Sequence, residues 1–278
     1  MANEYLKRTP TSSGNKRVFT ISAWTKINES NNANTLGNSH GSGSTFFTVR
    51  VATDGNTNSV LVYTIKGGTD YSRYWNLADR DCSSWIHHIF AFDTTALNVD
   101  DRVIYYRNGA KVTAYSDVYG SIPQNYEFDI LTSRSFEIFT NPDASTFGKG
   151  QIFDYFFVDG QQLTPDVFGF YKDGDGYQSS GTTQATDFKP GQWSPRAPKS
   201  IKYTINRSGG FGVNGFYLPM NDSSNPGADF HCEPNSIIKL KGEDLPQPQN
   251  GAPTTSDAYV SQLRTDPYAA NLVLAVPG

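Results

Sequence analysis

The chain has 278 residues, a formal net charge of −4 and a charged fraction of 18%. No basic run is longer than the pairs Lys7-Arg8 and Lys16-Arg17, whereas phosphate backbones are bound by clustered Lys and Arg. The apolar run at 86–92 is too short to span a bilayer, and the N-terminal residues lack the apolar core of a signal peptide. We therefore expect no nucleic-acid binding, no membrane insertion and no export by a signal peptide.

The composition favours β structure. Aromatic residues make up 14% of the chain, Gly occurs 25 times and Met occurs 2 times. Aromatic and β-branched side chains suit half-buried pleated surfaces, and Gly suits the turns between strands. Cys82 and Cys232 form no disulfide framework, so we expect reduced thiols, and the four histidines show no zinc-ligand spacing.

Strands are expected where apolar and polar residues alternate between turn signals. In chain order these segments are 18–24, 46–51, 60–66, 136–139, 214–220 and 236–241. Segments rich in Asn, Ser, Thr, Gly and Pro are expected to be loops, and they are 28–44, 67–81 and 173–200, with a looser region at 113–135. Residues 242–256 resemble a linker or strap in composition, and an apolar run follows at 272–276.

Two longer segments carry the strongest signals. Residues 85–112 read as a long half-buried strand, a connection and a hairpin closed on Asn108-Gly109, because Asn-Gly readily takes the positive φ angles of a type I′ turn. Residues 150–165 read as a buried strand, an Asp-Gly turn and a short helix with Thr164 as N-cap.

A family resemblance rests on these two segments. The strand ending in Asp93 and the hairpin at 106–109 resemble the laminin-G-like, concanavalin A-like jelly-roll domains. In that family a stretch similar to 163–165, Leu-Thr-Pro, closes the sandwich. The resemblance implies an all-β, antiparallel β-sandwich of the concanavalin A-like type, in a family made up largely of binding modules.

A narrower resemblance covers stretches spread over residues 1–220. The segments at 5–17, 19–26, 81–93, 147–165 and 214–218 are similar to jelly-roll proteins encoded by tailed bacteriophages. Such proteins are mostly virion components, namely tail fibres, head fibres or capsid decorations. The resemblance therefore implies a structural protein that is assembled in the host cytoplasm and located on the virion.

The domain organisation follows from the composition and the resemblance. We expect an N-terminal arm at 1–17, a sandwich at 18–221 and a C-terminal strap or arm at 222–278. A strap docked on the sandwich or on a neighbouring subunit is favoured, since a short segment rich in Pro and Gly would struggle to bury its own core. A small separate unit at 222–278 stays open.

The sequence lacks the glycosidase pattern of this fold. That pattern places carboxylates alternately along one strand, so that acid and nucleophile face one cleft. The nearest match is Glu127-Phe128-Asp129, but Leu131 and Thr132 stand where the second Glu is needed. We therefore expect no enzyme, and a polysaccharide-degrading enzyme with acids from separate strands remains the alternative.

Two adjacent histidines and one Asp-Gly segment are possible catalytic or metal sites. His87 and His88 are adjacent on a predicted strand, so one is expected in the core and the other on the wet face. The segment Asp-Gly-Asp-Gly at 173–176 begins like a calcium loop but lacks the Glu of an EF-hand. We expect no metal and no cofactor, with Ca²⁺ at this segment as the alternative.

The best candidate for ligand binding is the segment 68–75. Sugar rings present apolar faces that stack on aromatic side chains, while polar neighbours bond their hydroxyls. The predicted glycan-binding residues are Asp70, Tyr71, Tyr74, Trp75 and Trp193. The alternative is that these aromatics only cover the edge of the sandwich.

Together these features predict a non-enzymatic phage virion protein that either binds host surface glycans or cements neighbouring subunits. Its partners would be other virion proteins and copies of itself, with a trimer as the favoured assembly, since the arms could pair with the sheet edges of adjacent copies. The alternatives are the polysaccharide-degrading enzyme and a calcium-dependent carbohydrate-binding module.

Overall fold

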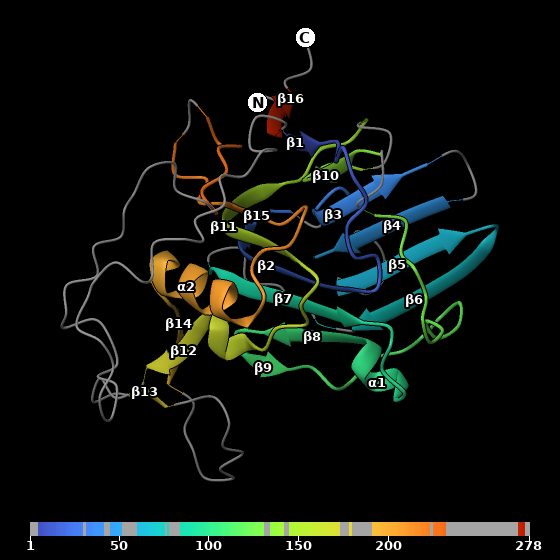
Figure 1. Ribbon diagram of the computed structural model, residues 1–278, viewed down its shortest axis with the longest axis horizontal. Helices are drawn as coiled ribbons and strands as arrows, with labels where there is room; N and C mark the ends of the chain where they lie inside the picture. Colours follow the sequence, from blue (N-terminus) through green and yellow to red (C-terminus); the bar gives the residue numbers. More distant parts are fainter. Residues whose placement is uncertain are drawn as a thin grey trace, which may run out of the picture.

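The computed structural model of the protein describes residues 5–29, 32–41, 45–51, 60–75, 77, 84–130, 134–141, 145–172, 178–179, 191–222, 225–231 and 272–275. They form an antiparallel β-sandwich of jelly-roll type, which confirms the predicted all-β class (Figure 1). Within these residues no helix has the length and apolarity needed to cross a membrane. The predicted calcium segment, the strand at 236–241 and both cysteines lie outside the described residues.

The first sheet has seven strands in the order β16-β1-β10-β3-β4-β5-β6. Their bounds are β1 Tyr5–Arg8, β3 Thr35–His40, β4 Thr45–Arg50, β5 Val60–Lys66, β6 Thr69–Trp75, β10 Phe136–Ile138 and β16 Leu272–Ala275. Strand β1 comes from the predicted N-terminal arm and β16 from the predicted C-terminal strap, and the two pair with each other. The domain boundaries themselves stay a prediction.

The second sheet has six strands in the order β15-β11-β2-β7-β8-β9. Their bounds are β2 Val18–Ile27, β7 Ile86–Asp93, β8 Val103–Arg107, β9 Ala110–Lys111, β11 Gly150–Asp159 and β15 Phe216–Leu218. The hairpin of β8 and β9 turns on Asn108 and Gly109, whose φ angles of 47° and 79° confirm the predicted turn.

A smaller layer lies outside the second sheet. It contains a three-stranded sheet and two helical segments, with bounds β12 Gly169–Lys172, β13 Gln178–Ser179, β14 Gln192–Pro195, η1 Pro165–Val167 and α2 Pro198–Ser208. The remaining helix is the short α1, Val99–Arg102, between β7 and β8. In Figure 1, α2 and η1 lie against the strands β7 and β11. The short helix predicted after Thr164 is thereby confirmed as η1.

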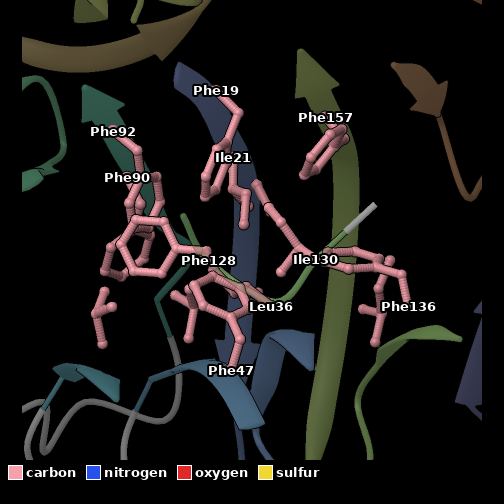
Figure 2. Packing of buried hydrophobic residues seen from close by; sticks show 14 of the residues in the cluster. Phe19, Ile21, Leu36, Phe47, Phe90, Phe92, Phe128, Ile130, Phe136 and Phe157 are labelled. Atoms are coloured by element: carbon pink, nitrogen blue, oxygen red, sulfur yellow. The ribbon is translucent and has the colours of Figure 1, made fainter. Parts of the chain in front are cut away.

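The main core lies between the two large sheets and is rich in phenylalanine. Phe19 of β2 stacks on Phe92 of β7 with ring centroids 4.2 Å apart, and Phe128 lies edge-on to both (Figure 2). Phe128 belongs to no strand, yet it also contacts Phe47 of β4 at 5.2 Å. The region predicted to be loose therefore fills the space between the sheets. Full burial of each Phe stabilises the fold by roughly 1.5–3 kcal/mol.

A second core lies between the six-stranded sheet and the outer layer. Ile89, Phe156 and Val158 face outward from that sheet and pack against Ile201 and Ile205 of α2. This cover explains why both adjacent histidines of β7 are buried, each being 1% exposed. The prediction that one of them lies on a wet face is wrong, because the outer face of the sheet at this position is not wet.

All three segments predicted to be loops contain strands, and the one at 173–200 contains β13, β14 and the start of α2. The pair Gly67-Gly68, with φ angles of 60° and 78°, reverses the chain and makes residues 69–75 the strand β6 beside β5. Gly-Gly suits a two-residue hairpin turn because both positions need positive φ. Strand β3 is polar in sequence, and it is ordered by ladders to β4 and β10 on its two sides. Helix α2 was not predicted either.

Candidate functional site

The outer face of the seven-stranded sheet carries the best candidate site. Successive residues of a strand point to opposite faces, so the core residues identify the outward-facing ones. Val60 and Val62 of β5 and Phe47 of β4 lie in the main core, so their sequence neighbours point outward. The ladders align these outward residues in three cross-strand rows: Arg50, Leu61 and Tyr74; Asn38, Thr48, Tyr63 and Ser72; His40, Phe46, Ile65 and Asp70.

An aromatic row crosses this face. It consists of His40 of β3, Phe46 of β4, Tyr63 of β5 and Tyr119, which follows the sheet edge at β6. Neighbouring ring centroids lie 6.0, 5.6 and 5.7 Å apart. Tyr119 is 55% exposed, so the row ends in a ring that is open to solvent. The strands β3, β4 and β5 that carry the other three rings run side by side in Figure 1.

Polar groups accompany the aromatic row. The Tyr63 hydroxyl donates to Asp70 Oδ2 at 3.1 Å, and the main-chain N–H of Tyr119 donates to Ser72 Oγ at 3.3 Å. Burial, followed by the Asp70 carboxylate, raises the pKa of Tyr63 to about 12, so its hydroxyl stays protonated near neutral pH. Burial also raises the pKa of Tyr74. The face therefore combines aromatic rings with hydroxyl groups and the Asp70 carboxylate.

A cation stands at one end of the same face. The Arg50 Nε donates to Thr48 Oγ1 at 3.4 Å, and the guanidinium lies 5.9 Å from the Phe46 ring centroid. Burial lowers the pKa of Arg50, while Tyr74 and Tyr63 nearby act in the opposite direction. Arg50 lies four residues from Asp70 along the strand direction, which corresponds to about 13 Å.

The structure does not gather the five predicted glycan-binding residues into one site. Asp70 and Tyr74 point outward beside the aromatic row, but Tyr71 and Trp75 point inward because they alternate with them along β6. Trp75 is 1% exposed and lies 5.2 Å from Tyr105, ring to ring. The prediction that these residues form one site is therefore wrong. It treated the segment as a loop, in which neighbouring side chains could point to the same side.

Trp193 lies in a different layer from the other four. It is on β14, is 8% exposed, and donates from Nε1 to Nδ1 of His87 at 2.9 Å. Its ring also stacks on that histidine at an interplanar angle of 20°. A ring enclosed in this way offers no free face to a sugar, so Trp193 is part of the packing between layers.

Sequence reasoning missed five residues of this face, namely Phe46, Arg50, Tyr63, Tyr119 and His40, the last of which lies in a segment predicted to be a loop. For the first three the signal was present, because both strands were predicted and their alternation assigns Phe46, Arg50 and Tyr63 to the face opposite the valines. Tyr119 carried no signal, since its place depends on the bridge between Ser116 and Tyr74 that holds the following residues at the edge of β6.

The acids at 127 and 129 are engaged by arginines. Glu127 Oε1 lies 2.8 Å from Arg17 Nη2, and Asp129 Oδ2 is bonded to Arg134 Nη1. Phe128 between them is fully buried in the main core. The two carboxylates therefore sit on the rim of the sandwich in ion pairs rather than along a sheet strand.

The contact between His87 and Ser22 does not have the geometry of a base activating a hydroxyl. His87 Nε2 lies 2.8 Å from Ser22 Oγ, but its Nδ1 accepts from Trp193. The proton of the neutral ring is then on Nε2 and points at the serine, so Nε2 cannot accept the serine proton. Burial lowers the pKa of His87 to about 3.

No metal site competes with the aromatic row in the described part of the chain. No group of three or more His, Cys, Asp or Glu side chains comes together there. One cavity of about 80 Å³ lies between Trp75, Tyr105 and Tyr115. Ligand pockets typically measure about 300–1,000 Å³, so this cavity suits solvent better than a sugar.

No family model matches the chain, and no curated protein sequence matches it. A native heptameric SAP-like pentraxin from Limulus polyphemus matches 59% of this chain and 72% of its own, with 14% identity and a TM-score of 0.39. Domain 4 of the arabinanase AbnA from Geobacillus stearothermophilus, solved with arabinotriose, matches 57% of this chain and 68% of its own. Its sequence identity is 17% and its TM-score is 0.38. Tailspike protein 2 of the Escherichia coli O157:H7 bacteriophage CAB120 matches 58% of this chain and 22% of its own, with 12% identity and a TM-score of 0.38. With TM-scores this low, none of these likenesses carries an argument about what the chain does.

Proposed function

We propose that the protein is a non-enzymatic carbohydrate-binding protein of a phage virion, and that its glycan lies across the aromatic row. The single observation that carries the binding role is the row itself, with His40, Phe46, Tyr63 and Tyr119 in ring-to-ring contact on the outer side of a sheet. Phe46 is 7% exposed and joins the other rings by packing, so the rings open to a sugar are His40, Tyr63 and Tyr119. Sandwich proteins usually bury their large rings, so a row whose two ends are open to solvent requires a reason.

The chemistry of the face suits a sugar. The apolar side of a pyranose ring packs on an aromatic ring, and its hydroxyls need donors and acceptors at the edges of that contact. The Asp70 carboxylate, bonded to the Tyr63 hydroxyl at 3.1 Å, supplies an acceptor next to the ring. The rigid sheet holds both groups in place, which lowers the entropic cost of binding.

Binding without catalysis is supported by the surroundings of the acidic residues. Glu127 and Asp129, the nearest match to a glycosidase pattern, are both paired with arginine. Two carboxylates lie on this face, Asp70 of β6 and Glu137 of β10, which the ladder aligns with Asn38. They are four strands apart, about 19 Å, and Glu137 Oε1 lies 3.3 Å from Lys7 Nζ. Glycoside hydrolysis uses two carboxyl groups about 5–10 Å apart, so these two acids are too far apart for it.

The virion setting is supported by the sequence resemblance to phage jelly-roll proteins. Other virion proteins and further copies of the chain are the expected partners, with a trimer as the favoured assembly. Strand β16, from the C-terminal part of the chain, pairs with β1 at the edge of the seven-stranded sheet. An edge position of this kind can also be filled by a neighbouring copy. Immunolabelling of purified particles tests this setting, and absence of the protein from virions would overturn it.

The binding role is tested on a glycan array with the full chain. We expect Tyr63→Ala and Tyr119→Ala to weaken binding by roughly ten-fold or more each, since each removes a stacking ring. Tyr203→Ala is the matched control, because Tyr203 is a 46% exposed tyrosine on α2, in a different layer. Equal binding by all three variants, or no binding of any glycan by the wild type, would refute the proposal.

A further inference from the structure

Arg50 occupies an unusual position on the aromatic face. It is the last residue of β4 and lies in one cross-strand row with Leu61 and Tyr74. Its Nε is bonded to Thr48 Oγ1, and its planar group lies 5.9 Å from the Phe46 ring. The side chain is therefore laid along the sheet beside the rings and does not project freely into solvent.

The charge of Arg50 is uncompensated among the described residues. No carboxylate there forms an ion pair with it. Of the two acids of the same face, Asp70 lies two cross-strand rows away and accepts from Tyr63, and Glu137 of β10 is paired with Lys7. A guanidinium has five N–H donors, and one of them is used, by Thr48. A partly buried cation without a counter-ion costs free energy, which a bound anion would recover.

Arg73, on β6 of the same sheet, is an arginine with a purely structural role and serves as a comparison. It points to the opposite face of β6, is 1% exposed, and meets both Asp117 oxygens at 3.0 and 3.3 Å. Its Nη1 donates to the carbonyl of Val103, and its Nη2, one of the two nitrogens bonded to Asp117, also donates to the carbonyl of Val99. The fold thus supplies full partners to the arginine on the inner side and leaves the terminal nitrogens of Arg50 without an acceptor in the described residues.

We propose that Arg50 binds the carboxylate of an acidic sugar, such as a uronic or sialic acid, whose ring lies on the aromatic row. This inference rests on the proposed function and narrows its ligand class. The planar fork of a guanidinium matches a carboxylate through two parallel hydrogen bonds, which a hydroxyl cannot reproduce. The chain carries a net charge of −4, so general attraction does not explain binding of an anionic glycan. The recognition must then come from a local group.

The experiment compares matched pairs of glycans. The panel contains oligogalacturonate, hyaluronan oligosaccharides and sialyllactose, each alongside a counterpart in which the carboxyl group is reduced to the alcohol. Binding of the full chain is measured by calorimetry for the wild type, Arg50→Gln and Arg50→Lys. Arg207→Gln is the control, because Arg207 is an exposed arginine on α2 whose guanidinium lies 5.6 Å from the Tyr203 ring. A thermal melt of each variant verifies that it is folded.

We expect the wild type to bind at least one acidic glycan roughly ten-fold or more tighter than its reduced counterpart. Arg50→Gln should abolish this preference while leaving the weaker binding of the reduced glycan, and Arg50→Lys should retain part of it. Arg207→Gln should behave like the wild type.

Two kinds of outcome overturn the inference, and they are distinguishable. If the acidic and reduced forms bind equally well and the binding needs Tyr63, the carboxylate is not recognised although the glycan-binding proposal stands. The role of Arg50 is likewise refuted if Arg50→Gln keeps the preference for the acidic form. If neither form of any pair binds the wild type, the proposed function fails together with the inference.

Discussion

Trp193 donates a hydrogen bond from Nε1 to Nδ1 of His87 at 2.9 Å, across 106 positions of the chain. His87 in turn stacks on Trp24 of the neighbouring strand, with ring centroids 4.7 Å apart. The contact joins β14 of the outer layer to β7 in the middle of the six-stranded sheet. The aromatic row lies on the other large sheet, so the packing between layers and the proposed glycan binding involve separate aromatic groups of the same sandwich.

Trp193→Phe should therefore destabilise the protein without changing glycan binding. The substitution removes the Nε1 donor and leaves Nδ1 of His87 buried without its partner. An unsatisfied buried group costs about 1–3 kcal/mol. Urea unfolding measures the loss, and the array of Tyr63-dependent glycans measures binding. Loss of glycan binding with unchanged stability would show instead that Trp193 belongs to the binding site.

Acid should destabilise the protein through its buried histidines. Burial lowers the folded-state pKa of His87 to about 3 and that of His88 well below its usual value. The unfolded chain then binds more protons than the folded chain as pH falls from about 6.5 towards 3, so stability is present above that window and is lost within it. For His87 alone the loss between pH 7 and pH 5 is about 2 kcal/mol.

The measurement is a set of urea curves at pH 7, 6 and 5 for the wild type and His87→Gln. Burial raises the pKa of Asp154 and Asp159, so these two acids favour the folded state as the pH falls. Their effect is the same in the wild type and in His87→Gln, so the difference between the two proteins reports on His87. The stability advantage of the wild type over the variant should shrink as the pH falls. An advantage that stays constant from pH 7 to pH 5 would contradict the assignment.

Gly109→Ala should be more damaging than Gly160→Ala. Both glycines have positive φ, 79° and 93°, so a side chain is strained at either position. A Cβ on Gly109 would lie 2.3 Å from the Trp193 ring, whereas a Cβ on Gly160 meets no atom within 4 Å. We expect Gly160→Ala to cost about 1–2 kcal/mol and Gly109→Ala to cost about 1–3 kcal/mol more. Equal losses in thermal melts would show that Trp193 does not pack over the turn.

Chelation should leave glycan binding unchanged. The two carboxylates of the aromatic face, Asp70 and Glu137, are four strands apart, whereas calcium sites gather six to eight oxygen ligands around one ion. Binding measured in EDTA and in added Ca²⁺ should give the same affinity. A strong requirement for Ca²⁺ would instead favour the calcium-dependent alternative and direct attention to Asp173 and Asp175.

The fold class was predictable because strand alternation and turn chemistry are local signals. Residues 18–24 alternate and form part of β2, and Asn108-Gly109 makes the expected hairpin turn. Strand β3 was not predictable in this way, since its polar residues are ordered by neighbours far away in sequence. The six-stranded sheet is covered on both faces, which buries both adjacent histidines. This cover likewise depends on long-range packing that the local sequence does not reveal.

The candidate site was predictable in part. Asp70 and Tyr74 were identified because aromatic and acidic residues cluster at 68–75, and both lie on the aromatic face. Trp75 was assigned to the site wrongly. The segment was predicted to be a loop, so the alternation of its side chains was not considered, and Trp75 in fact lies in the main core. Arg50 and Tyr63 were not recognised because they become neighbours only when β4, β5 and β6 pair.

The most direct test of the central claim is a crystal structure of the full chain with a glycan that binds in solution. The proposed function predicts a sugar ring packed on Tyr63 and Tyr119, with a hydroxyl bonded to Asp70. A sugar found instead on the exposed pair Trp85 and Phe153, which are 41% and 39% exposed on the other sheet, would contradict it.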